Sequence, residues 1–146
     1  MSAVRAQEIA QKLLDSMGIS SIVSIDSDEP IYLSISTKDS ALLIGKHGDN
    51  LKALQIIVNT IYRHNDPEAG FVGIDVEGYK KERVEKVQAV AQEMAQKAIE
   101  TGEPQHLKPM NSFERRSVHT LLAEDPNIVT DSEGEGLNRH IVIRKR

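Results

Sequence analysis

The apolar residues of this chain recur with two different periods. Between residues 3 and 17 they fall at helical spacing, and Gly18 follows where a helix is expected to end. Residues 21–25 and 30–36 are rich in β-branched side chains, and in the second run apolar and polar residues alternate, which is typical of a half-buried strand. The polar residues 26–29 between them predict a hairpin.

A glycine-flanked segment interrupts the next helical pattern. Residues 40–44 predict a short helix that ends at Gly45, and after Gly48 a second helix begins, with Asp49 or Asn50 as its expected cap. Asn65-Asp66-Pro67 ends this helix, and an apolar strand is predicted over residues 71–76. The order helix, strand, strand, helix, helix, strand is complete within residues 1–78.

The second half begins with a long helix. Its apolar stripe runs over residues 79–101, and Gly102-Glu103-Pro104 ends it. Asn111 with Glu114 three positions later resembles a capping box at the start of another helix. The elements predicted here are a helix over 79–101, a short strand over 105–108, a helix over 111–123, and strands over 127–130 and 140–144. The acidic residues 131–136 are expected to form a solvated turn between the last two strands.

The composition fits a water-soluble globular protein. The 146 residues are 39% hydrophobic and 27% charged, and the net charge is −4. The absence of cysteine excludes disulfides and thiolate metal sites. No apolar run approaches the roughly 18 residues that span a membrane, and the N-terminal residues lack the apolar core of a signal peptide. We therefore expect a cytoplasmic protein that does not insert into membranes.

Charge is unevenly distributed along the chain. A net negative charge argues mildly against a strong nucleic-acid binder, because Lys and Arg contacts with phosphates supply most non-specific affinity. The tail over residues 138–146, however, contains Arg139, Arg144, Lys145 and Arg146 and no acidic residue. Because the tail is basic despite the net negative charge, the sequence is compatible with a phosphate-binding surface.

The segment Gly45-Lys46-His47-Gly48 has two interpretations. It is either a tight turn between two helices or a clamp for phosphates. Glycine permits positive φ and close approach of a ligand backbone, the following helix offers free N–H groups, and Lys46 and His47 supply positive charge and a ring. In isolation the turn is favoured about two to one, because Gly-x-x-Gly is common.

Arg115 and His119 form a second candidate site. Their spacing of four places both side chains on one helix face, where Arg can bind a phosphate and His can stack on a base. The alternative is a local ion pair of Arg115 with Glu114 or Asp125 and a surface His119, which is favoured about three to one for an isolated pair.

The arrangement of these motifs resembles known modules. Residues 1–78, with the segment LLIGKHGDNLKALQIIVN, resemble a KH domain of the bacterial type II topology (αββααβ). The resemblance implies a groove for about four nucleotides, in which Gly45, Lys46, His47 and Gly48 clamp the backbone. Ile44 and Leu51 are expected beside its apolar floor.

The second half resembles the domain named for an Arg and a His separated by three residues, a module of single-stranded nucleic-acid binding. The segment MNSFERRSVH, followed by SEGEG and a basic strand, is the most specific part of the match. The pair of domains resembles the Jag (SpoIIIJ-associated) family of bacterial RNA-binding proteins. Many members carry an additional N-terminal domain, whereas this sequence starts at the KH helix. The expected fold is α+β, with a KH domain over 1–78 joined by the long helix to a small α/β sandwich over 79–146.

Catalytic and metal motifs are not found in the sequence. Residues 45–50 do not match a nucleotide-binding P-loop, and the five histidines show no helical metal-ligand spacing. Asp131, Glu133 and Glu135 alternate but lack the spacing of an EF-hand. We therefore expect no enzyme activity, no cofactor and no metal.

The sequence thus predicts a non-enzymatic regulator that binds single-stranded RNA, with a role in RNA or cell-envelope processes. The RNA-binding residues are expected to be Gly45, Lys46, His47, Gly48, Arg115, His119, Arg139 and Arg144. Two alternatives remain open: a single-stranded DNA binder, and an adaptor whose basic face binds an acidic protein. A homo-oligomer, or a hetero-oligomer with another KH protein, is a further expectation.

Overall fold

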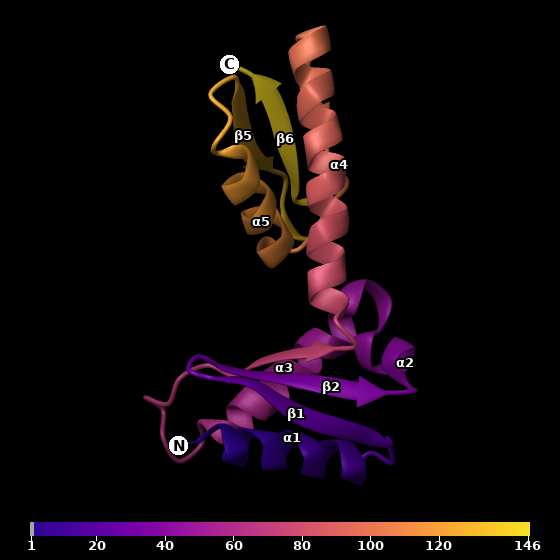
Figure 1. Cartoon of the computed structure of the whole chain (residues 1–146), viewed down its shortest axis with the longest axis vertical. Helices are drawn as coiled ribbons and strands as arrows, with labels where there is room; N and C mark the ends of the chain where they lie inside the picture. The colour runs from indigo at the N-terminus through magenta and orange to yellow at the C-terminus, as the bar shows by residue number, and fades with distance from the viewer. Residues whose placement is uncertain (1) are drawn as a thin grey trace. The chain divides into compact units, whose positions relative to one another are not determined.

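The structure is a computed structural model that describes residues 2–146 (Figure 1). The chain divides into two compact units, one ending at Lys80 and the other beginning at Lys81. Each unit combines one three-stranded sheet with helices, so the predicted α+β class is confirmed.

The first unit has the predicted element order. Its sheet has the order β1-β2-β3, with β1 antiparallel and β3 parallel to the central β2. The order αββααβ is that of a type II KH domain. Its elements are α1 (Ala3–Ser16), β1 (Ser21–Asp28), β2 (Ile31–Thr37), α2 (Ser40–Ile44), a 3₁₀ turn (Lys46–Gly48), α3 (Asp49–Tyr62) and β3 (Gly73–Val76).

Apolar side chains of α1 and α3 pack against the sheet and form the core of this unit. Leu14, Leu33, Val58 and Ile74 are completely buried. The buried amide of Asn59 ties α3 to the segment before β3, because it accepts from the backbone N–H of Val72 at 2.8 Å and donates to its carbonyl at 2.8 Å. With both its polar atoms bonded, Asn59 avoids the cost of an unsatisfied buried group.

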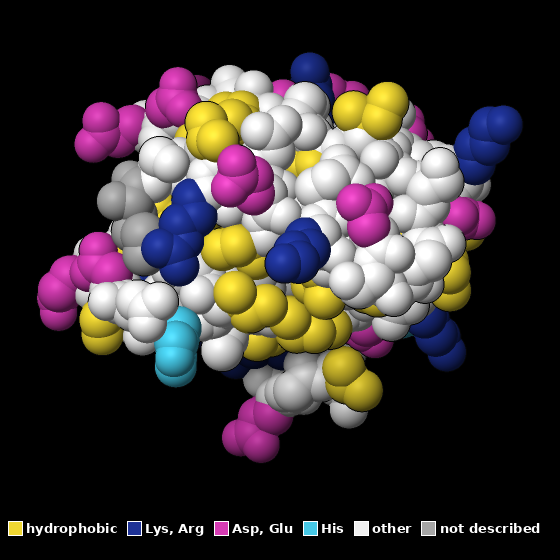
Figure 2. Space-filling model, turned by 90° about the horizontal axis from the view of Figure 1, so that it is seen from below, with side chains coloured by type: hydrophobic (Ala, Val, Ile, Leu, Met, Phe, Trp, Pro, Cys, Tyr) yellow, Lys and Arg dark blue, Asp and Glu magenta, His cyan; other side chains and the backbone are white. Residues whose placement is uncertain are grey.

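Apolar side chains also reach the surface of this unit. Ile57 and Ile61 of α3 are 46% and 43% exposed. Ile61 lines a groove together with Ile9, Lys12 and Leu13 of α1. Figure 2, which views the molecule from the side of α1, shows hydrophobic side chains gathered next to Lys and Arg side chains.

The second unit is built on an antiparallel sheet with the order β4-β6-β5. Small and apolar residues of α4 and α5, including Ala91, Ala98, Val118 and Leu122, pack against Ile143 of the central strand. The elements are α4 (Tyr79–Thr101), β4 (Gln105–His106), α5 (Ser112–Leu122), β5 (Ile128–Glu133), a 3₁₀ turn (Gly136–Asn138) and β6 (His140–Lys145).

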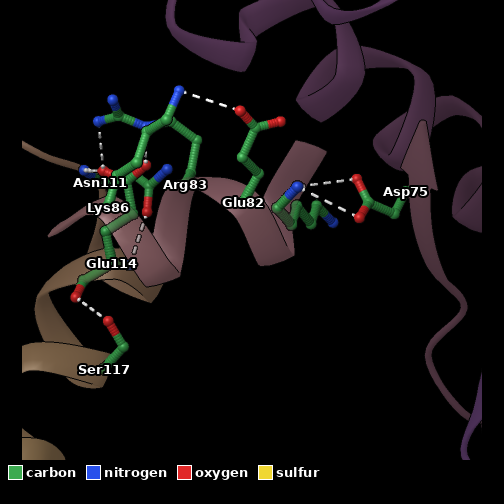
Figure 3. Close-up of polar contacts among 8 residues, drawn as sticks. Asp75, Glu82, Arg83, Lys86, Asn111, Glu114 and Ser117 are labelled. Carbon is green, nitrogen blue, oxygen red and sulfur yellow. Dashed lines mark hydrogen bonds and ion pairs between the residues drawn. The ribbon is translucent and has the colours of Figure 1, made fainter. Parts of the chain in front are cut away.

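A polar network fixes the start of α5 against α4 (Figure 3). The predicted capping box is confirmed, because the side chain of Asn111 accepts from the backbone N–H of Glu114 and Glu114 accepts from that of Asn111. The Glu114 side chain is only 7% exposed and also pairs with Arg83 of α4 at 3.0 Å. The local ion-pair alternative required Glu114 to pair with Arg115. Glu114 pairs with Arg83 instead.

Two predicted boundaries in the second unit were wrong. β5 continues to Glu133, so Asp131 and Glu133 lie in a strand and not in a solvated turn. In this strand they are the register partners of Val142 and His140 on β6. The two acidic residues are two positions apart, so both lie on the same face of β5. β4 is shorter than predicted and ends at His106.

Among the described residues, no helix is both long and apolar enough to span a membrane.

Candidate nucleic-acid interface

The loop between α2 and α3 has an unusual backbone. Gly45, His47 and Gly48 all have positive φ, at 71°, 57° and 78°. Glycine adopts this region freely, and His is one of the few other residues enriched there. Because three of the four loop residues have positive φ, the chain turns sharply here, and α3 begins at the residue after Gly48.

Gly45 is required by a close neighbour as well as by its φ. A Cβ at this position would lie 2.5 Å from Cγ of Asn50. The Asn50 side chain in turn donates to the carbonyl of Leu42 at 2.8 Å and braces the end of α2. Asn50 therefore holds the loop from behind, and it does not cap α3 as the sequence suggested.

The start of α3 has no capping side chain, although the N–H of Asp49 already donates to the carbonyl of Lys46 and that of Gly48 to the carbonyl of Gly45 at 3.4 Å. Its N-cap is Gly48, in the left-handed conformation and without a capping side chain. The first N–H groups of a helix without such a cap, together with the helix dipole, favour an anion. Lys46 and His47 are exposed beside this end, and within residues 2–146 neither side chain has a hydrogen bond or ion pair. The loop thus offers backbone donors and two unengaged basic groups in one place.

The apolar surface beside the loop differs from the expected one. Ile44 is half-buried, as a residue lining a groove should be. Leu51 is only 2% exposed and belongs to the core, so it supports the loop from within and does not form a groove floor. Leu42, which is 61% exposed, offers the open apolar surface.

In the second unit, the backbone of Met110 makes hydrogen bonds to both Arg115 and Arg139. The guanidinium of Arg115 donates to the carbonyl of Met110 at 2.6 Å, while the N–H of Met110 donates to the carbonyl of Arg139 at 3.3 Å. Arg139 also donates to the carbonyl of Gly134 at 2.8 Å. Because both guanidinium groups bond neutral carbonyls, each keeps its full positive charge and further N–H donors.

His119 lies one turn along α5 from Arg115 and is held at both ring nitrogens. Nδ1 is 2.7 Å from the hydroxyl of Thr130, and Nε2 is 2.9 Å from the hydroxyl of Ser132. Partial burial lowers the pKa of His119; Arg115 and Arg139 lower it further, and Asp131 opposes them. The structure thus brings three of the predicted residues, Arg115, His119 and Arg139, into one positively charged cluster.

Comparison with known families agrees with this division. Residues 5–71 match the family described as KhpA/KhpB, KH domain, and residues 85–145 match the Arg-xxx-His (R-3-H) domain. The chain combines a KH domain with an Arg-xxx-His domain.

The most similar relatives include proteins named RNA-binding protein KhpB. The KhpB of Clostridium symbiosum is 31% identical over 95% of this chain and 64% of its own length. The protein of that name from Streptococcus pneumoniae is 30% identical over 97% of this chain and 43% of its own length. The one from Bacillus subtilis is 34% identical over 86% of this chain and 62% of its own length. The chain thus spans between about two fifths and two thirds of the length of each of these relatives.

Arg144 lies apart from the cluster of Arg115, His119 and Arg139. Side chains alternate along a strand, and Thr130 and Ser132 point to His119, so Asp131 and Glu133 occupy the other face of β5. Arg144 lies on that face and pairs with Asp131 at 3.0 Å and with Glu133 at 2.8 Å. Its charge is therefore balanced locally, unlike those of Arg115 and Arg139.

Several residues that support the two candidate sites were not identified from the sequence. Two exposed apolar side chains of the Arg-xxx-His domain were not identified either: Phe113 on α5 is 59% exposed, and Leu137 in the turn before Arg139 is 95% exposed. Thr130 and Ser132 orient His119, and Asn50 braces the glycine loop of the KH domain. Exposure and these hydrogen bonds are properties of the folded chain, so no pattern in the sequence indicates them.

Proposed function

We propose that this protein binds single-stranded RNA at two places, the glycine loop of the KH domain and the Arg115 cluster of the Arg-xxx-His domain. The observation that supports this most directly is the loop itself. Among the described residues, the side chains of Lys46 and His47 have no hydrogen bond or ion pair beside the uncapped start of α3, an arrangement that suits a phosphate. The names of the relatives support RNA as the ligand. No residue is assigned a chemical step.

The Arg115 cluster contributes charge and hydrogen-bond donors. Arg115 and Arg139 keep free donors for one or two phosphates, and His119, whose ring nitrogens are both bonded to hydroxyls, adds positive charge beside them when it is protonated. Phe113 is exposed on α5, but residues two positions apart on a helix do not share a face, so its ring is not part of this cluster. Arg144 is a weaker candidate because two carboxylates offset its charge.

The test replaces both basic residues of the loop by acids. Lys46→Asp combined with His47→Asp puts two negative charges where a phosphate would lie, and we expect affinity for a single-stranded RNA oligonucleotide to fall roughly 10- to 100-fold. Fluorescence anisotropy at two salt concentrations measures this. Binding by the unchanged protein should weaken with salt, by about 0.7 in log K per log unit for each phosphate contacted.

A matched control separates a local effect from one of net charge. Lys12 and His64 are both exposed on the same unit, away from the loop, and Lys12→Asp with His64→Asp changes the total charge equally. We expect this control to lose no more than about twofold in affinity. Equal losses in both variants, with folding retained, would refute the clamp. A matching single-stranded DNA oligonucleotide tests the preference for RNA.

The second candidate is a protein adaptor, and the exposed apolar residues Ile57 and Ile61 beside the α1–α3 groove favour it. An adaptor would show no salt-sensitive binding to oligonucleotides at micromolar concentrations. Light scattering of the purified chain, alone and mixed with a second KH protein, would test the expected oligomer.

A further inference from the structure

The outward face of the second unit's sheet brings together two histidines and a glutamate from three strands. His106 lies on β4, His140 on β6 and Glu133 on β5. Glu133 and His140 are register partners, and His106 is the partner of Val142, which lies two residues beyond His140 on β6 and therefore on the same face. The three residues are far apart or irregularly spaced in the sequence, so no short motif reveals them.

The spacing of these side chains is that of metal ligands. Nδ1 of His106 lies 3.1 Å from Nε2 of His140, and the two rings have centroids 5.3 Å apart. One ligand atom from each of the three residues lies within 4.8 Å of the other two. Two nitrogens 3.1 Å apart, each at about 2.1 Å from an ion, subtend about 95° at that ion, close to the octahedral angle and below the tetrahedral one.

The ring of His140 is already oriented for this role. Its Nδ1 lies 2.8 Å from the carbonyl oxygen of Asn138, which can only accept, so this nitrogen carries the proton. Nε2 therefore presents a lone pair toward His106. A histidine that donates its other N–H to a backbone carbonyl is the usual arrangement around a metal ligand. Without an ion this lone pair can accept from Nδ1–H of His106, so metal binding requires His106 to carry its ring proton on Nε2 instead.

Glu133 can contribute without losing its ion pair. Arg144 engages Oε1 of the carboxylate, and Oε2 remains for a cation. A partner that holds a ligating carboxylate in this way is common in metal sites.

We propose that His106, His140 and Glu133 bind one divalent cation of borderline softness, such as Zn²⁺, with water in the remaining positions. The ion would join all three strands of the sheet and would hold β4, which is only two residues long. The role is structural and does not depend on RNA binding. The absence of a helical His spacing, which argued against a metal in the sequence, does not apply to ligands carried on adjacent strands.

The experiment titrates the full chain, freed of metal, with Zn²⁺ alone. Calorimetry should give one site per chain with a Kd in the micromolar range. Zinc at tenfold its Kd should raise the Tm by roughly 5 °C. In NMR spectra of the unchanged protein, the imidazole signals of His106 and His140 should shift on titration, while those of His64 should not.

Variants locate the site. His106→Gln and His140→Gln should each lower zinc affinity at least tenfold, and His64→Gln, at an exposed position of the first unit, should not change it. Absence of binding up to millimolar Zn²⁺ would overturn the proposal. So would binding that persists in both ligand variants, or NMR shifts confined to other histidines. Since the NMR result needs no variant, a substitution that impairs folding does not leave the question open.

Discussion

The loop at residues 45–48 presents backbone to its surroundings, whereas the cluster around Arg115 presents side chains. In the loop, positive φ values and a missing Cβ create the shape, and the basic side chains are unengaged. In the cluster, Arg115, His119 and Arg139 are each held by neutral oxygens, namely backbone carbonyls and hydroxyls. The backbone conformation shapes the first candidate site, and hydrogen-bonded side chains form the second.

The difference decides which changes each site tolerates. A site made of backbone is insensitive to the identity of an exposed side chain but depends on glycine where φ is positive. A site made of restrained charges tolerates small backbone shifts less well and depends on each charge having no acidic neighbour. The two sites should therefore fail under different substitutions.

The largest effect is expected for Gly45→Ala, with Gly78→Ala as its matched control. Both glycines have φ near 70°, but only Gly45 has an atom within 3 Å of the added Cβ. Alanine at residue 78 should lower the free energy of unfolding by about 1 kcal/mol through backbone strain alone. Alanine at residue 45 should cost roughly 3 kcal/mol and also abolish binding through the loop. Urea unfolding and RNA anisotropy measure the two effects.

A second substitution isolates the contact from the strain. Asn50→Gly removes Cβ, Cγ and Nδ2 of Asn50, which all lie within 3 Å of the new Cβ. The double variant should therefore lose less stability than the sum of the two single variants, because part of the cost is shared. If the losses simply add, Asn50 does not limit residue 45 and strain explains the whole effect.

The next effect compares Arg115→Ala with Arg144→Ala. Arg115 bonds a neutral carbonyl, so its removal should lower RNA affinity about tenfold or more and reduce the salt slope by about 0.7. Arg144 pairs with Asp131 and Glu133, so its removal should change affinity by no more than about twofold. Anisotropy titrations over a range of salt concentrations measure both. Equal losses would mean that the ion pairs of Arg144 open on binding and that the sheet face belongs to the RNA site.

The element order and the capping box were predictable because they depend on local patterns. Alternating apolar residues, helical stripes and the Asn111-x-x-Glu114 spacing each express a rule that operates within a few residues. The boundaries at β5 were not predictable in this way. Asp131 and Glu133 have the composition of a turn, but pairing with β6 and with Arg144 draws them into a strand.

The sequence predicted which residues form the candidate sites, but it did not predict which neighbours those residues contact. The glycine pair and the Arg115 spacing gave the positions of the two candidate sites, whose binding of RNA stays a prediction. The partners of His119 come from another strand, and the partner of Gly45 is a side chain expected to cap a helix. The face on which Arg144 lies follows from strand register, which a basic tail in the sequence does not reveal.

The smallest effect concerns pH and distinguishes the restrained cluster from the open loop. Burial lowers the pKa of His119 in the folded protein below that of the unfolded chain, which is near 6.5. The unfolded state therefore takes up a proton first, and the contribution of this residue to stability is complete above pH 6.5 and declines as the pH falls below it. His47, exposed in the loop, has no such burial.

RNA should act on His119 in the opposite direction. A phosphate beside the ring favours the charged form, so bound RNA raises the pKa, and linkage then requires affinity to increase as the pH falls through the same range. Between about pH 7.5 and 5.5 we expect a gain of about two- to threefold that His119→Gln removes, with affinity and unfolding measured on both proteins. A gain that survives in His119→Gln and disappears in His47→Gln would assign the proton to the loop. In that case the restrained ring stays neutral when RNA binds, and the difference between the two sites lies in which of them can change its charge.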